Sequence, residues 1–229
     1  MENYATIVWD CDGVILNSNN IKSDAFRAVS LPFGDLASSI LVDYHKRNGG
    51  ISRYNKFNYF IESIMPMHAP EVFIEDKSKF LHRLLQEFSS IVKAELVNCQ
   101  VAPGLRELRH SMGDQPWYIV SGGDQSELRE VFEHRGIADY FNGGIYGSPR
   151  DKFAIITNLL EVEDFHLPGL FVGDSRLDHE VARHFGLDFI FLSQWTEYDD
   201  WQQYCRINEI LAVQAISDIL KLEIKPIKS

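Results

Sequence analysis

YATIVWDCDG (residues 4–13) joins a short apolar run to two aspartates, Asp10 and Asp12. The run is rich in β-branched and aromatic residues, which predicts a buried strand over residues 4–9. Side chains at i and i+2 of an extended segment point the same way, so the two carboxylates can converge on one site. Gly13 permits the sharp exit that such a strand end needs. The alternative is that one aspartate caps a turn, or that both are solvated.

The composition is globular, with an acidic balance. The chain has 229 residues, of which 45% are hydrophobic and 24% charged, and its formal net charge is −11. This length favours one domain with an insertion, or two unequal domains. Broad binding of nucleic acid is not expected, because the chain has no basic excess to neutralise phosphates. A small anion can still bind where positive charge or a metal ion is concentrated locally.

The cysteines and the hydropathy pattern bear on the compartment. Cys11, Cys99 and Cys205 are odd in number and scattered in spacing, which argues against a disulfide framework. No apolar stretch has the length of a membrane span, and the first ten residues lack the pattern of a signal peptide. We therefore expect a cytoplasmic protein with neither a membrane nor a nucleic-acid partner.

The chain divides into two parts with different patterns. Residues 21–98 predict helices and no convincing strand, with helical spacing clearest over residues 69–92. From about residue 100, predicted strands alternate with predicted helices, which indicates an α/β fold with a parallel sheet. The strands are expected over residues 116–123, 167–175 and 187–193, and the helices over 101–112, 124–136, 151–161, 178–186 and 208–222. We assign residues 1–16 and 100–229 to an α/β core domain and residues 17–99 to an inserted helical domain.

Two of the later signatures are weak when taken singly. Ser121 stands at the predicted end of a strand, and Gly122 and Gly123 after it leave backbone N–H groups accessible to an anion. Such a segment is usually only a turn. Lys152 lies in the first turn of a predicted helix, where the helix dipole disfavours a cation. A surface lysine is the ordinary alternative there.

A further signature is VGDSRLD (residues 172–178), at a strand-to-helix turn. Ser175 and Asp178 resemble a capping box, which would account for both without a function. A capping box does not explain Asp174 at the end of an apolar strand. Ligands of open α/β sheets bind at the carboxyl ends of the strands, where these signatures are expected to meet. Carboxylates suit Mg²⁺ together with phosphate oxygens, and one carboxylate can act as a nucleophile while another transfers a proton.

Together the motifs resemble the haloacid dehalogenase superfamily of phosphatases and phosphomutases. The resemblance rests on Asp10-Cys11-Asp12-Gly13, Ser121, Lys152 and the segment Gly173–Asp178, in the order and spacing of the family. It implies a Rossmann-like parallel-sheet core. The insertion after the first motif resembles the helical C1 cap of the family's first subclass, as in phosphoglycolate phosphatase and β-phosphoglucomutase.

The resemblance also implies roles for single residues. Asp10 would be the nucleophile and a Mg²⁺ ligand, and Asp12 would be the general acid and base, with its backbone carbonyl on the metal. Ser121, Gly122 and Lys152 would bind the phosphoryl group. Asp174 would ligate Mg²⁺, and Asp178 would support the metal directly or through water. Cys11 and Asn17 depart from the family's usual residues, a bulky apolar one and an acidic one respectively.

A basic segment stands out in the inserted domain. Residues 44–57, YHKRNGGISRYNKF, carry four Lys or Arg residues and no acidic residue. We interpret it as a loop that presents Arg53, Lys56 and His45 to an anionic or polyhydroxyl leaving group. A solvated basic helix-turn-helix is the alternative. Residues 17–20 and 98–103 are expected to be the hinges of cap closure.

The sequence thus predicts a Mg²⁺-dependent phosphatase that acts on a small phosphorylated metabolite through an aspartyl-phosphate intermediate. A sugar phosphate, a sugar-acid phosphate or a phosphoglycolate-like compound would be the substrate. A phosphomutase of the β-phosphoglucomutase type and a non-catalytic binding module are the alternatives. The aromatic segment of residues 194–205 is interpreted as a packed loop, with an interface or a lid flank as alternatives.

Overall fold

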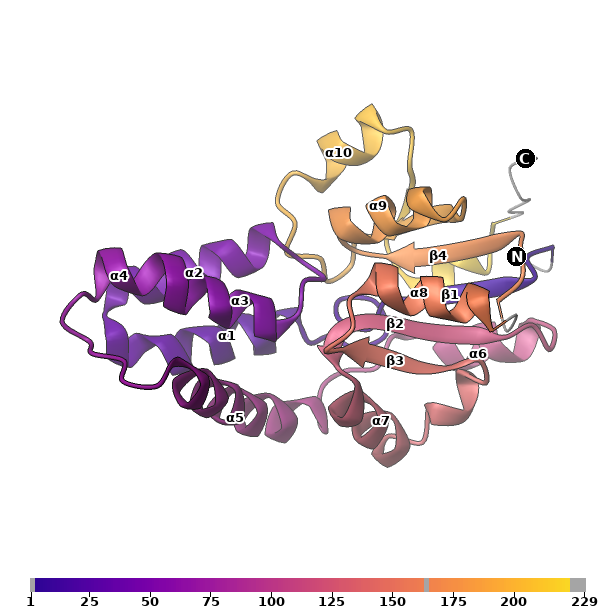
Figure 1. Ribbon diagram of the computed structural model, residues 1–229. Coiled ribbons are helices and arrows are strands. Elements are labelled where there is room, and N and C mark those ends of the chain that lie inside the picture. Colours follow the sequence, from indigo (N-terminus) through magenta and orange to yellow (C-terminus); the bar gives the residue numbers. More distant parts are fainter. Residues whose placement is uncertain (1–2, 163–164, 223–229) are drawn as a thin grey trace.

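A six-stranded parallel sheet forms the centre of the molecule in the computed structural model, which describes residues 3–162 and 165–222 (Figure 1). The strand order is β3-β2-β1-β4-β5-β6, and every neighbouring pair is parallel. The predicted α/β class with a parallel sheet is confirmed. The strands are β1 (Thr6–Trp9), β2 (Trp117–Asp124), β3 (Gly144–Ser148), β4 (Gly169–Gly173), β5 (Asp188–Leu192) and β6 (Leu211–Val213).

Strand β1 lies in the middle of the sheet, between β2 and β4. All four of its residues are buried, because helices cover both faces of a parallel sheet. Trp9, its last residue, is in register with Ile119 of β2 and Val172 of β4. The residues that follow these strands therefore emerge at the same edge of the sheet.

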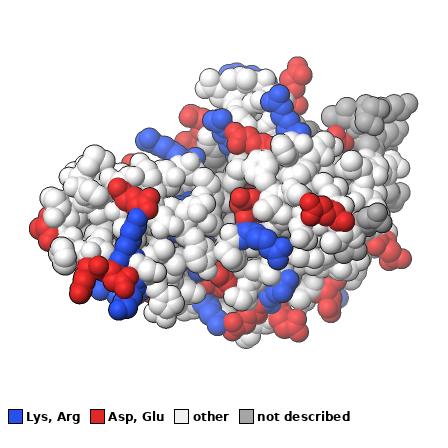
Figure 2. Space-filling view, viewed as in Figure 1, with Lys and Arg blue, Asp and Glu red and all other residues white. Residues whose placement is uncertain are grey.

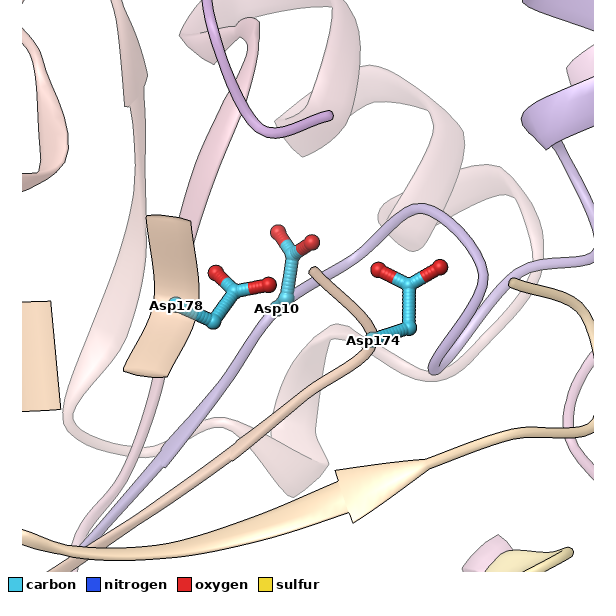
Figure 3. Close-up of side chains that lie close together, drawn as sticks. All are labelled: Asp10, Asp174 and Asp178. Atoms are coloured by element: carbon cyan, nitrogen blue, oxygen red, sulfur yellow. The ribbon is translucent and has the colours of Figure 1, made fainter. Parts of the chain in front are cut away.

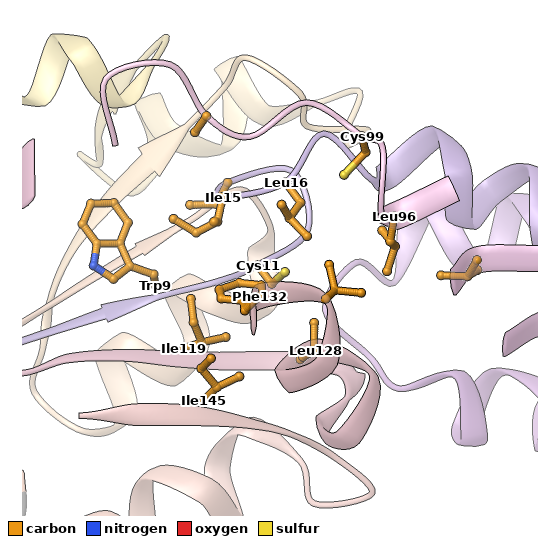
Figure 4. Packing of buried hydrophobic residues seen from close by; sticks show 14 of the residues in the cluster. Trp9, Cys11, Ile15, Leu16, Leu96, Cys99, Ile119, Leu128, Phe132 and Ile145 are labelled. Atoms are coloured by element: carbon orange, nitrogen blue, oxygen red, sulfur yellow. The ribbon is translucent and has the colours of Figure 1, made fainter. Parts of the chain in front are cut away.

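Two apolar clusters fill the space on the two faces of the sheet. Neighbouring residues of a strand point to opposite faces, so Trp9 belongs to one cluster and Val8 to the other. Figure 4 shows part of the first cluster, where Cys11, Ile119 and Phe132 pack together. The helices of this part are α6 (Leu105–Ser111), α7 (Gln125–His134), α8 (Lys152–Glu161), α9 (Arg176–His184), α10 (Trp201–Ile207) and α11 (Ile216–Ile219), with a 3₁₀ turn at Ala138–Tyr140.

The segment between β1 and β2 forms a bundle of helices beside the sheet (Figure 1). Residues 17–99, all of which the structure describes, contain no strand. Phe26 lies at the centre of the bundle, with its ring 5.1 Å from that of Phe57 and 4.4 Å from that of Phe88. The helices are α1 (Asn19–Ser30), α2 (Asp35–Arg47), α3 (Arg53–Tyr59), α4 (Met65–His68) and α5 (Lys77–Leu96), with a 3₁₀ turn at Leu31–Phe33 and a π-helical turn at Phe60–Ile64.

The two connections between the bundle and the sheet run side by side. The Asn17 N–H donates to the Gln100 carbonyl at 2.9 Å, and Leu16 forms an antiparallel bridge with Val101. We propose that these paired segments mark the boundary between a core domain and a cap domain, as predicted for residues 17–99. A narrow double connection of this kind suits a hinge.

Three local predictions were wrong. Strand β3 (Gly144–Ser148) was not expected, because its two glycines weaken the strand pattern. Residues 208–222 form the short strand β6 and helix α11 instead of one helix. Helix α5 begins at Lys77 rather than near residue 69, because the Asp76 side chain caps it by accepting from the Lys79 N–H. No helix among residues 3–162 and 165–222 is long and apolar enough to cross a membrane.

Candidate active site

The structure brings the predicted site residues together at one edge of the sheet. Asp10 and Asp12 follow β1, Ser121 lies in β2 and Asp174 follows β4. Lys152 and Asp178 come from the first turns of α8 and α9. All of them except Asp12 are at most 5% exposed. The parallel sheet explains this convergence, because its strands all end at the same edge.

Three carboxylates form an acidic cluster (Figure 3). Asp10, Asp174 and Asp178 each offer an oxygen atom, and these three atoms lie within 4.8 Å of one another. Burial, with the charges of Asp178 and Asp12 and against the opposing charge of Lys152, raises the pKa of Asp10 to about 7. Burial and the charges of Asp10 and Asp178 raise the pKa of Asp174 well above its ordinary value. The cluster is therefore under electrostatic strain that a bound cation would relieve.

The donor set of this cluster fits a hard divalent cation such as Mg²⁺, which prefers oxygen ligands. One oxygen of Asp174, Oδ2, accepts from Asn19 Nδ2 at 2.8 Å, which fixes the orientation of the carboxylate. Both oxygens of Asp178 already accept hydrogen bonds, Oδ1 from Lys152 and Oδ2 from Ser175. Asp178 is thus best placed to hold its neighbours in position, and the Asp12 carboxylate is not part of the cluster.

Lys152 lies between two of the carboxylates. Its Nζ is 2.8 Å from Asp10 Oδ1 and 2.5 Å from Asp178 Oδ1, and the residue is 1% exposed. Burial alone would lower the pKa of Lys152, but the charges of Asp10 and Asp178 outweigh it and raise the pKa. The side chain therefore stays an ammonium group. The alternative interpretation as a surface lysine is excluded.

Asp12 points toward the helical insertion. Its Oδ1 accepts from Ser18 Oγ at 2.6 Å, and its Oδ2 accepts from Lys22 Nζ. Burial would raise the pKa of Asp12, but the charge and hydrogen bond of Lys22 and the hydrogen bond of Ser18 outweigh it and lower the pKa. Gly13 takes a φ of +76°, and a Cβ atom there would lie 2.1 Å from Asp174 Oδ2. Only glycine permits this tight turn between the two aspartates and Asp174.

Ser121 and Gly122 line the other side of the site. Ser121 Oγ accepts from the Gly123 N–H at 3.0 Å and lies 3.5 Å from Asp12 Oδ2. A Cβ atom at residue 122 would come 2.2 Å from the carbonyl oxygen of Gly50. Gly122 therefore lies directly against the basic segment of the insertion, which covers the site.

A cavity of about 270 Å³ lies between the acidic cluster and the insertion. Its core side includes Asp10, Asp12, Gly122 and Asp174, and its cap side includes Lys22, Phe26, His45, Arg53, Lys56 and Phe88. Acidic and basic side chains are interspersed over the outer face shown in Figure 2, without a patch of one sign. Within the basic segment, Arg53 and Lys56 are buried in the cavity wall, whereas Lys46 and Arg47 are exposed.

Arg53 and Lys56 occupy different environments in the cavity wall. Arg53 donates to both oxygens of Glu127 in α7, at 3.0 and 2.6 Å, and Ser89 Oγ donates to the same carboxylate. The guanidinium also lies 4.8 Å from the centre of the Phe88 ring. Arg53 thus joins the cap side to the core, and its charge is compensated. Lys56 Nζ instead lies 2.7 Å from His45 Nδ1.

Several residues that shape the site were missed from the sequence. Lys22 stands one turn into a helix that directly follows the paired aspartates, and Asn19 lies in the polar stretch before it, so both carried a weak signal. Nothing marked Glu127, because its partner is 74 residues away.

The segment of residues 194–200 also reaches the site, whereas residues 201–205, predicted with it as a packed loop, form the start of helix α10 instead. Thr196 Oγ1 donates to the Asp174 carbonyl at 2.7 Å. The Glu197 carboxylate accepts from Ser23 of the insertion. These contacts make the segment a third wall of the cavity, next to the strand ends and the insertion.

Comparisons with known proteins agree with this geometry. Residues 4–186 match the model of the haloacid dehalogenase-like hydrolase family. No curated protein matches the sequence. The fold is similar to that of a predicted phosphoglycolate phosphatase from Haemophilus somnus, at a TM-score of 0.72 and 18% identity over 96% of this chain and 98% of that one. It is also similar to a predicted phosphatase from Clostridium acetobutylicum, at a TM-score of 0.70 and 16% identity over 96% and 99% of the two chains.

Proposed function

The chain belongs to the haloacid dehalogenase-like hydrolase family, and we propose that it is a Mg²⁺-dependent phosphatase acting through an aspartyl-phosphate intermediate. Its substrate would be a small phosphomonoester, such as a sugar phosphate, a sugar-acid phosphate or a phosphoglycolate-like compound. The observation that carries the proposal is the convergence of Asp10, Asp12 and Asp174 on one cavity, with Lys152 paired to Asp10 behind it. Two proteins of similar fold are named as predicted phosphatases, which supports the proposal.

The first step would transfer the phosphoryl group to the protein. A carboxylate oxygen of Asp10 attacks phosphorus, and the bond from phosphorus to the leaving oxygen breaks. Asp12 donates a proton to that oxygen from its protonated form, which its lowered pKa makes the minor form, so the leaving group departs as an alcohol. Lys152 lies 2.8 Å from Asp10 and is therefore placed to neutralise charge on the phosphoryl oxygens.

The second step would release phosphate. Asp12, now ionised, takes a proton from water, and the water oxygen attacks phosphorus. The bond between phosphorus and Asp10 breaks, which restores the carboxylate and releases inorganic phosphate. The low pKa of Asp12, held down by Lys22 and Ser18 against the effect of burial, favours the base form that this step needs. The net reaction consumes one water molecule for each phosphomonoester.

Asp10 and Asp174 would hold the Mg²⁺ ion, with the backbone carbonyl of Asp12 as a further ligand and Asp178 as support. When bound, the ion supplies positive charge that offsets the repulsion between the carboxylates and the phosphate. Asn19 and Ser175 keep two of the acidic side chains in place through their hydrogen bonds. Such supporting contacts commonly tune a metal site.

The test is phosphate release by the purified full-length chain from a broad panel of phosphomonoesters, in Mg²⁺ and after chelation with EDTA. We expect release from at least one substrate, stoichiometric with substrate loss and dependent on Mg²⁺. An isomerised product without stoichiometric phosphate would indicate a phosphomutase. The absence of any Mg²⁺-dependent turnover across the panel would contradict the proposal and favour a binding module.

A further inference from the structure

The buried cations of the molecule differ in how their charges are compensated. Among residues 3–162 and 165–222, four Lys or Arg side chains are buried. Three of them contact a carboxylate: Lys22 contacts Asp12, Arg53 contacts Glu127, and Lys152 contacts Asp10 and Asp178. The fourth is Lys56, which is 2% exposed and has no carboxylate at ion-pair distance within the described chain.

The nearest polar neighbour of Lys56 is a histidine. Lys56 Nζ lies 2.7 Å from His45 Nδ1. An ammonium group only donates hydrogen bonds, so Nδ1 accepts and the ring proton lies on Nε2. Burial lowers the pKa of His45 well below its ordinary value, and the charges of Lys56, Lys22 and Lys46 lower it further. The ring is therefore neutral, with an N–H donor at Nε2.

This Nε2 atom is itself without a partner. It is buried and makes no hydrogen bond with any of the described residues, and the closest carboxylate oxygen, Glu197 Oε2, is 3.9 Å away. A buried donor that stays unsatisfied costs free energy, and so does a buried cation without a counter-charge. Burial and the charge of Lys22, against the more distant charges of Asp12 and Glu197, lower the pKa of Lys56 to about 7, which reflects that cost. Both side chains line the cavity that contains Asp10.

We propose that Lys56, held in place by His45, binds a second anionic group of the substrate, a carboxylate or a second phosphate carried by the leaving group. This inference rests on the proposed phosphatase function and narrows its substrate class. The Nζ hydrogens that His45 Nδ1 leaves free can be donated to the oxygen atoms of an oxyanion, whereas His45 Nε2 lies on the far side of the ring and faces Glu197. An anion at Nζ would supply a counter-charge at ion-pair distance, which none of the described carboxylates supplies. Arg53 does not take this role, because Glu127 already occupies its guanidinium.

The size of the site limits the leaving group. Lys56 lines the same cavity as Asp10 and Asp12, so the second anionic group would bind near the transferred phosphoryl group. The cavity of about 270 Å³ fits a small metabolite. We therefore expect a compound in which a few carbon atoms separate the two anionic groups.

The experiment compares substrates that differ in one anionic group. One pair is 3-phosphoglycerate and glycerol 3-phosphate, which tests a carboxylate. The other pair is glucose 1,6-bisphosphate and glucose 1-phosphate, which tests a second phosphate. For the pair that matches the site, we expect the wild-type chain to favour the doubly anionic member by at least about 30-fold in kcat/KM. The pair that shows the preference identifies whether the second anionic group is a carboxylate or a phosphate.

Two variants locate the preference on Lys56. Lys56→Met and Lys56→Gln remove the charge, and Gln keeps a donor in case Met perturbs folding. In both variants we expect the ratio of kcat/KM between the paired substrates to fall to within about threefold of one, with a rise in KM for the doubly anionic member. Lys93→Met is the matched control, because Lys93 is half-exposed and pairs with Glu130 away from the cavity. It should keep the wild-type ratio.

The outcomes separate this inference from the proposed function. Phosphate release without a preference in either pair would overturn the inference and leave the phosphatase assignment standing. An equal loss of kcat/KM for both members in the Lys56 variants would also overturn it, since Lys56 would then act on the transferred phosphoryl group. No phosphate release from any substrate would contradict the proposed function and, with it, this inference.

Discussion

The strand ends and the helical insertion form two walls of one cavity, and their charges are arranged differently. At the strand ends, Lys152 lies between Asp10 and Asp178, so a buried cation and its buried counter-charges belong to the same chain. On the cap side, Lys56 is equally buried, but none of the described carboxylates lies at ion-pair distance from it. The comparison indicates that the core pairs its buried cation within the chain, while the insertion keeps one buried cation without such a pair.

The largest expected effect on activity comes from a substitution at the strand ends alone. Asp10→Asn keeps the shape of the side chain but removes the nucleophile, so we expect Mg²⁺-dependent phosphate release to fall by about 10,000-fold or more. Phosphate assays on the best substrate of the panel measure this. Asp43→Asn, an exposed aspartate of α2, is the matched control and should retain activity. Turnover by Asp10→Asn near the wild-type rate would show that the reaction does not use this carboxylate.

A second change tests whether the core compensates its own charges. Lys152→Met would leave Asp10 and Asp178 facing each other without a cation, so we expect the free energy of unfolding to fall by about 3–5 kcal/mol in the metal-free protein. Urea denaturation measures the loss. Lys93→Met again serves as the exposed control. An unchanged midpoint would mean that the three charged groups are not coupled in the folded state.

The third change concerns the contact that joins the two walls. Arg53→Met removes both hydrogen bonds to Glu127, which is 6% exposed and would keep only the Ser89 contact. We expect a loss of about 2–4 kcal/mol in the free energy of unfolding. Arg83→Met is a close control, because the Arg83 guanidinium also lies 4.8 Å from the centre of a phenylalanine ring but is exposed.

Similar losses in Arg53→Met and Arg83→Met would contradict the assignment of Arg53 as a structural link. Burial of the Arg53–Glu127 pair is the property that sets the two arginines apart, since exposed ion pairs contribute at most about 1 kcal/mol.

The smallest expected effect is at the edge of the same contact. The Tyr54 hydroxyl donates to Asp124 Oδ2 at 2.9 Å, from α3 to the residue that caps α7. Tyr54→Phe should lower the free energy of unfolding by about 1 kcal/mol, by the loss of one hydrogen bond. Tyr59→Phe, which changes a tyrosine with a half-exposed ring stacked on Tyr44, should cost less. A larger effect in Tyr59→Phe would place the stabilising contact elsewhere in the bundle.

The sequence predicted the core side better than the cap side, for a physical reason. An apolar strand that ends in a carboxylate is a local pattern, and a parallel sheet brings the ends of β1, β2 and β4 to one edge. The acidic cluster and Lys152 could therefore be located before the structure. The positions of Arg53 and Lys56 depend on which acidic residue packs against which helix. No local pattern in the sequence shows that Arg53 pairs with Glu127, or that Lys56 contacts His45 rather than a carboxylate.

Strand β3 and the Asn19–Asp174 contact also could not be predicted from local sequence patterns. The glycines of β3 carry little strand propensity, and pairing with β2 supplies what the local sequence lacks. Asn19 and Asp174 are 155 residues apart, and only the turn at Gly13 brings them within 2.8 Å. Contacts that form only once the sheet has assembled cannot be predicted from residues that are neighbours in the sequence.

The most direct test of the proposed mechanism is the covalent state of Asp10 during turnover. The wild-type chain is mixed with its best substrate and Mg²⁺, quenched in acid within the first turnovers, digested and analysed by mass spectrometry. The proposed mechanism predicts one phosphoryl group on the peptide that contains Asp10, absent when the substrate or Mg²⁺ is omitted and absent in Asp10→Asn. Rapid phosphate release with no phosphoryl group on that peptide, or with one on another residue, would contradict it.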